Sequence, residues 1–207
     1  RSSDLGKEFT VPVDPDTVKE RTLTYESSNT DLVSVGSDGK VTVNHATAGE
    51  TDKCVVIKVT AAAQNDYVAT TPLEYKVIVN QSEITSLNQF DNWTKSIERI
   101  YSEDTALKIE GSLTKNNNYK VVLDAKLEEA NAGENKAYSV DASKSYDIKD
   151  AAGHADYILT KGFTDTDSVM TQVTIKKRPV YLTLDNKDIA VQYGRSYDDL
   201  KQEIESK

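Results

Sequence analysis

The side chains that most often carry out nucleophilic or metal chemistry are scarce in this sequence. Among 207 residues there are two histidines, His45 and His154, and one cysteine, Cys54. Cys54 and His45 could meet on neighbouring strands, where an imidazole would favour the nucleophilic thiolate. Because Cys54 opens a run of alternating apolar residues, we predict that it is a small packing residue instead. His154 lies in the small-residue stretch 151–155, for which we predict a solvated loop histidine.

The spacing of these residues matches no established catalytic or metal-binding motif. The sequence has no cysteine or histidine pair at zinc-finger spacing, no glycine-rich phosphate loop and no Gly-x-Ser-x-Gly nucleophile turn. A single cysteine excludes an intramolecular disulfide, so folding does not depend on oxidation. We therefore expect no catalytic residues, no cofactor, no hydrolase activity and no tight binding of transition metals.

Three aspartates that follow one another closely, Asp147, Asp150 and Asp156, are the candidate calcium ligands. Hard cations take several oxygen ligands, which carboxylates and backbone carbonyls can supply together. The stretch lacks the Asp-x-Asp-x-Asp-Gly spacing of an EF-hand loop, and acidic turns are more often only solvated. For Asp165 and Asp167 we likewise predict solvated acidic residues in a turn.

Two aromatic residues, Trp93 and Tyr197, are the candidate ligand-binding side chains. An exposed ring can stack on the apolar face of a sugar, which makes such residues relevant to carbohydrate binding. For Trp93 we favour a different role, in which the indole fills the junction between two modules.

The residues around these candidates predict an all-β protein. Tyrosine (11) far outnumbers phenylalanine (3) and tryptophan (1), and the chain is rich in valine and threonine, a composition typical of strands. Apolar residues alternate with polar ones in many short runs, which predicts antiparallel sandwiches; examples are Leu23 and Tyr25, Val55, Ile57 and Val59, Tyr119, Val121 and Leu123, and Val173 and Ile175. Two stretches favour helical turns instead, residues 88–99 and 196–207.

An internal repeat sets the predicted module length. Asp66-Tyr67, shortly before one predicted strand, is matched 90 residues later by Asp156-Tyr157 before another. We therefore predict three modules, residues 1–80, 81–178 and 179–207, with separate cores in 7–80 and 84–178. The last 29 residues would form a hairpin over 180–193 and a short helix, a ββα fragment that opens a third module. We expect this hairpin to be held by the helical face of Tyr197, Leu200 and Ile204, by the second module or by another chain.

Charge and hydropathy exclude two classes of partner. Lysine and arginine total 25 against 34 aspartate and glutamate residues, a net charge of −9, and the basic cluster 176–178 is short. Binding to a phosphate backbone is therefore not expected. Because the chain has no apolar run of about 20 residues, we expect no membrane insertion of this segment.

The first 80 residues resemble a known repeat. The segment 25–35, which contains Ser27-Ser28-Asn29, together with the turn Ser37-Asp38-Gly39-Lys40-Val41 and the pair Ala48-Gly49, is similar to the bacterial immunoglobulin-like group 2 repeat. The resemblance covers about residues 7–80. The sequence departs from the family in residues 44–53, which are longer and more polar than usual, and in the extension 64–67.

The rest of the chain resembles two other repeats of bacterial surface proteins. Residues 100–106, 131–136, 156–159 and 173–179 are similar to a YDG repeat, although Ser102-Glu103 replaces the Asp-Gly that gives it its name. Residues 182–194 resemble the start of an MBG module. These families imply a tandem array on a bacterial cell surface or in a secreted protein, without catalytic residues.

We therefore expect a non-enzymatic segment, excised from a longer extracellular or cell-surface protein, that acts as a rigid stalk and is monomeric within that chain. Two alternatives stay open. One is an adhesin module that binds a host glycan or surface protein, and the other is an accessory module of a secreted carbohydrate-active enzyme. Exposed, co-planar aromatic rings would favour glycan binding, whereas packed aromatics would favour the spacer.

Overall fold

The fold is all-β, as the alternating pattern predicts. The computed structural model describes residues 6–64, 66–181 and the positions 196, 198, 201, 202 and 205. Among the described residues up to Lys176, helical structure is limited to the four-residue α1 (Pro15–Val18) and two 3-10 turns, η1 (Leu87–Gln89) and η2 (Thr166–Ser168). α1 begins after Asp14, whose carboxylate accepts a hydrogen bond from the Asp16 N–H and thereby caps the turn.

Residues 8–77 form two antiparallel three-stranded sheets around one core. The first sheet has the order β1-β4-β3 and the second the order β2-β5-β6. The strands are β1 (Glu8–Thr10), β2 (Leu23–Ser27), β3 (Val33–Val35), β4 (Lys40–Val43), β5 (Val55–Ala61) and β6 (Leu73–Val77). Alternate residues of β4 and β5 point inward, so that both sheets contribute to a cluster containing Val41, Val43, Val55, Ile57 and Val59.

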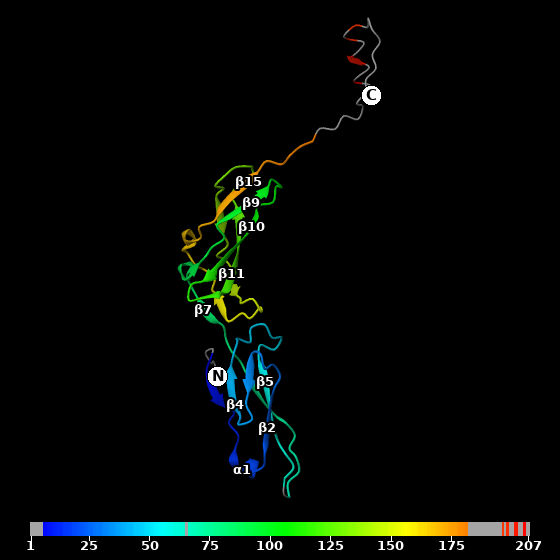
Figure 1. The fold of residues 1–207 in the computed structure, drawn as a ribbon, viewed down its shortest axis with the longest axis vertical. Coiled ribbons are helices and arrows are strands. Elements are labelled where there is room, and N and C mark those ends of the chain that lie inside the picture. The colour runs from blue at the N-terminus through cyan, green and yellow to red at the C-terminus, as the bar shows by residue number, and fades with distance from the viewer. Residues whose placement is uncertain are drawn as a thin grey trace. The chain divides into compact units, whose positions relative to one another are not determined.

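Residues 82–176 form three further sheets, with the strand orders β12-β11-β10-β8, β13-β14-β7 and β15-β9. The strands are β7 (Ser82–Ile84), β8 (Phe90–Asp91), β9 (Ser96–Ile100), β10 (Ala106–Leu113), β11 (Asn116–Leu127), β12 (Tyr138–Val140), β13 (Tyr146–Ile148), β14 (Tyr157–Leu159) and β15 (Gln172–Lys176). The long β10–β11 hairpin lies at the centre of this part (Figure 1). Its inward residues form a second core that includes Ile109, Val121 and Leu123.

The prediction of purely antiparallel sheets is wrong for this second part. β7 pairs in parallel with β14, and β9 pairs in parallel with β15. A hairpin turn can join only antiparallel neighbours, so these pairs bring together strands that are distant in the sequence. Alternation predicts where the strands lie, but it carries no information about which strand pairs with which.

The two cores share no residue. The first cluster ends at Val79 and the second begins at Ile84. Between them the chain has no long linker, because β7 already starts at Ser82.

Residues 1–176 form one compact unit and residues 177–207 another. Most of the predicted hairpin and Tyr197 lie outside the described residues, and the described Val180 and Tyr181 are exposed.

The helical turns predicted for residues 88–99 are wrong beyond Gln89. The chain leaves η1 at once for β8 and then forms β9, which is held by its parallel pairing with β15. The spacing of Phe90, Trp93 and Ile97 is compatible with a helix, but each of these residues packs against the second core from extended or irregular backbone. The prediction that the indole of Trp93 fills the junction between the modules is therefore wrong. The indole covers the second core instead.

Trp93 lies directly on Gly111 of β10, and this contact gives a first prediction. A Cβ atom added at Gly111 would collide with the six-membered ring of Trp93. We expect Gly111→Ala to displace the indole, to shift its fluorescence to longer wavelength and to lower the free energy of unfolding by about 1–3 kcal/mol. Trp93 is the only tryptophan, so the emission is unambiguous. Gly49→Ala is the control, because its Cβ would meet no atom within 4 Å; equal spectra for both variants would contradict the prediction.

Candidate functional site

The two histidines, which the sequence separates widely, lie stacked on each other. Their ring centroids are 3.7 Å apart and the ring planes differ by 7°. His45 follows β4, and its backbone N–H donates to the carbonyl of Leu32 at 3.0 Å. His154 follows a tight turn between β13 and β14, in which Gly153 has a φ of 95° that favours glycine. The two loops thus present one imidazole each to a common site.

A buried carboxylate holds the first imidazole in place. The side chain of Asp156 is 1% exposed and accepts a hydrogen bond from Nδ1 of His45 at 2.8 Å. It also accepts from the backbone N–H of Ala46 at 2.6 Å and from the hydroxyl of Tyr119. Burial and the hydrogen bond to Asp156 raise the pKa of Tyr119 above its ordinary value, so the phenol keeps its proton and remains a donor. Three donors thus compensate for the loss of water around one carboxylate.

Two other aspartates hold the second imidazole. Nδ1 of His154 lies 2.9 Å from Oδ2 of Asp150, and Nε2 lies 2.7 Å from Oδ2 of Asp31. These hydrogen bonds raise the pKa of His154 above its ordinary value. Although burial by itself raises the pKa of a carboxyl group, the hydrogen bonds from His154 lower the pKa of Asp150. The prediction of a solvated loop histidine is therefore wrong: the side chain is 15% exposed and bonded at both ring nitrogens.

The three candidate calcium ligands face different partners. Asp156 is hydrogen-bonded to His45 and Asp150 to His154. Asp147 instead accepts a hydrogen bond from Nε2 of Gln81 at 2.9 Å. Asp165 accepts from the Ser86 hydroxyl and the Asn88 N–H and so caps η1, and Asp167 is exposed in η2. In the part of the chain that the structure describes, the one cluster with metal-competent groups is Asp31, His45 and His154.

Cys54 takes no part in this cluster. Its thiol is free and half-buried, and no hydrogen bond between described residues joins it to His45. His45 instead contacts Asp156 and His154. The arrangement therefore offers imidazole and carboxylate groups without an adjacent nucleophile.

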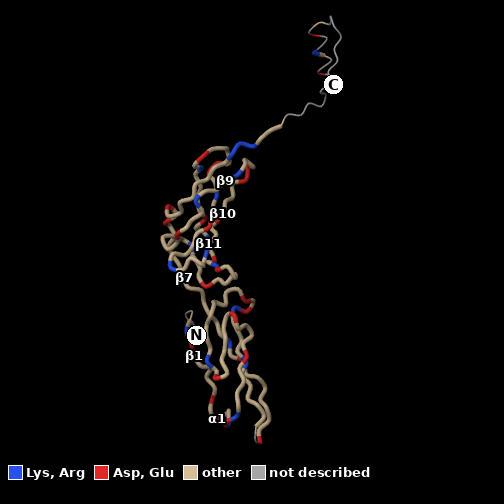
Figure 2. Tube along the Cα trace, in the orientation of Figure 1, with Lys and Arg blue, Asp and Glu red and all other residues tan. Residues whose placement is uncertain are grey.

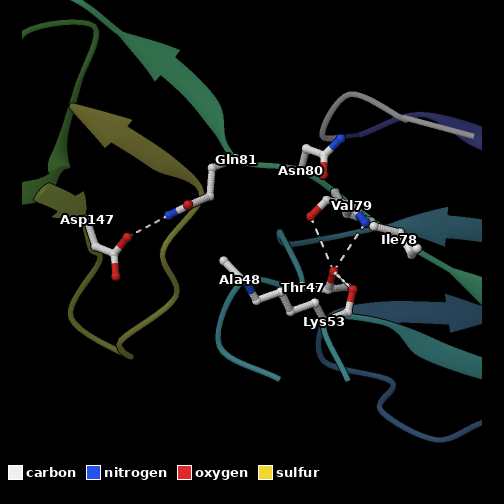
Figure 3. A pocket seen from close by; sticks show the side chains of 8 residues that line it. All are labelled: Thr47, Ala48, Lys53, Ile78, Val79, Asn80, Gln81 and Asp147. Carbon is white, nitrogen blue, oxygen red and sulfur yellow. Dashed lines mark hydrogen bonds between the residues drawn. The ribbon is translucent and has the colours of Figure 1, made fainter. Parts of the chain in front are cut away.

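A small pocket lies beside the same junction (Figure 3). It has a volume of about 350 Å³ and is lined by residues of both modules, among them Thr47, Val79, Gln81 and Asp147. The Thr47 hydroxyl donates to the carbonyl of Lys53 at 2.7 Å and accepts from the N–H of Val79 at 3.2 Å. These bonds tie the polar segment 44–53 to the end of the first module.

Sequence reasoning missed Asp31 and Tyr119. Asp31 belongs to a turn in which its own N–H donates to the side chain of Asn29, and Tyr119 is an inward residue of β11. Nothing in either local pattern indicates a role at the junction. The sequence did single out His45, His154, Asp150 and Asp156, but as separate features and not as one site.

Comparisons with family models, with curated proteins and with solved structures found no match for this chain. The resemblance to surface repeats therefore stays a prediction. Acidic and basic residues are interspersed along the described chain (Figure 2). Among the described residues, no helix has the length and apolar character needed to cross a membrane.

Proposed function

We propose that this chain is a non-enzymatic segment of a bacterial cell-surface or secreted protein. Two consecutive β-sandwich-like modules, the first immunoglobulin-like and the second YDG-like, followed by the start of a third, would act as a rigid spacer that projects a binding domain. The observation that carries this proposal is the contact of Asp156 with the first module. A carboxylate of the second module is fully buried against the Ala46 N–H and the His45 ring.

Rigidity at this junction is supported by the short connection as well as by the buried contact. The residues Asn80 and Gln81 separate Val79 of the first core from β7. The N–H of Ser82 donates to the carbonyl of Asp156 at 2.8 Å, so the first residue of the second module is bonded beside the same carboxylate. Because a flexible connection needs residues without fixed partners, this segment is poorly suited to be a hinge.

The described aromatic residues favour a spacer over a glycan-binding module. Trp93 packs on Phe90 and the second core, and Tyr119 packs edge-on against Tyr157. The more exposed ring of Tyr67 lies under the guanidinium of Arg21. A platform of co-planar exposed rings would be needed to stack a sugar, and these contacts do not form one.

Residual dipolar couplings of the full chain test the spacer proposal. If the junction is rigid, one alignment tensor should fit the amides of both modules, residues 8–79 and 82–176, and Asp156→Ala should require two tensors. The matched variant Asp147→Ala removes a carboxylate whose hydrogen-bond partner among the described residues is Gln81, so one tensor should still suffice. Two tensors for the unmodified protein would refute the rigid spacer. Saturable binding of a glycan by that protein would favour the adhesin alternative.

A further inference from the structure

We propose that Asp31, His45 and His154 bind a divalent transition-metal ion, and that Zn²⁺ fits the site best. Each of the three residues offers one ligand atom, and these atoms all lie within 4.8 Å of one another. Two imidazoles and a carboxylate suit zinc, whereas calcium and magnesium prefer oxygen ligands alone. Three protein ligands would leave a fourth position for water. Composition alone predicts no tight binding of transition metals, because histidine and cysteine are scarce, but the fold brings both histidines to one place.

The groups behind the imidazoles are the strongest argument for a metal site. A histidine that binds a metal through one ring nitrogen usually donates its other N–H to a carboxylate, which fixes the tautomer and makes the ligand more basic. Here Nδ1 of His45 is held by Asp156 and Nδ1 of His154 by Asp150. On both rings this leaves Nε2 for the metal. Within the described residues, Nε2 of His45 has no hydrogen-bond partner, and Nε2 of His154 faces Asp31.

The charge and mobility of the cluster also suit a cation. Three carboxylates, Asp31, Asp150 and Asp156, surround two imidazoles, so a divalent ion would balance negative charge that the protein alone leaves close together. The Asp31 side chain is 71% exposed and can move to a ligating position without disturbing a core. The two ring planes are nearly parallel in the metal-free chain, so metal binding requires the imidazoles to rotate apart until their in-plane Nε2 lone pairs converge on one point.

Titration of the chelator-stripped, tag-free full chain with Zn²⁺ alone tests the proposal. Calorimetry together with elemental analysis after dialysis should give one zinc per chain. Asp31→Asn and His154→Gln should abolish this binding, and Asp150→Asn should weaken it about 10- to 100-fold through the lost carboxylate partner. Asp147→Asn is the control, since Asp147 lies at the same junction but contacts neither imidazole, and it should leave the affinity unchanged.

Co²⁺ gives a second readout that reports on the ligands themselves. Bound to two imidazole nitrogens and a carboxylate, it should show visible absorption bands that are lost in Asp31→Asn. Because Asp31 is exposed, this variant should keep the circular dichroism spectrum of the unmodified chain, so loss of binding is not loss of fold. The proposal is overturned if the chain binds no zinc, or if Asp31→Asn and His154→Gln bind it as tightly as the unmodified chain. Neither readout depends on whether the chain is a spacer.

Discussion

Asp156→Ala is expected to lower the free energy of unfolding by about 3–5 kcal/mol, the usual cost when one partner of a buried charged contact is removed. The carboxylate is buried and accepts from the Ala46 N–H, the His45 ring and the Tyr119 hydroxyl. Removing it leaves these donors without their acceptor, and Ala46 and Tyr119 are both buried. The loss should therefore exceed that for a typical surface hydrogen bond several-fold.

Urea unfolding in the presence of a chelator measures this loss without any contribution from bound metal. Asp147→Ala serves as the matched control, because it removes a carboxylate from the same junction whose partner Gln81 is accessible to water. We expect the control to stay within about 0.5 kcal/mol of the unmodified protein. A cost below about 1 kcal/mol for Asp156→Ala would mean that water replaces the carboxylate, and the buried contact would then not hold the modules together.

Leu123→Ala is expected to destabilise the second module by about 2–5 kcal/mol. Leu123 is an inward residue of β11 with no exposed surface, and it lies in the centre of the second core. Truncation removes apolar surface from the core and leaves a cavity that the long β10–β11 hairpin cannot close, since both strands are fixed by their ladder of hydrogen bonds.

The neighbouring Val122 provides the control for this prediction. Its side chain points to the opposite face of β11 and is 47% exposed, so Val122→Ala should change the stability by about 0.5 kcal/mol or less. Unfolding can be followed by the fluorescence of Trp93, which packs against the same core. Similar losses for Leu123→Ala and Val122→Ala would contradict the assignment of inward and outward faces on this strand.

The sequence by itself determines where most of the strands lie. In β5 and β11, apolar residues occupy alternate positions, and because successive side chains of a strand point to opposite faces, this pattern is sufficient to assign the buried face. The turn after β3 is also encoded locally, since Gly39 has a φ of 79° and its N–H closes the turn on the carbonyl of Gly36. Such features depend on a few neighbouring residues.

Strand pairing and the histidine site are decided only by the tertiary structure. The pattern at residues 88–99 fits a helix, yet parallel pairing of β9 with β15 extends the chain there, because those hydrogen bonds come from a partner remote in sequence. His45 and Asp156 are 111 positions apart, and His154 and Asp31 are 123 apart. The sequence supplies these imidazole and carboxylate groups. Their hydrogen bonds form only because folding brings three separate loops together, and no local pattern specifies which loops will meet.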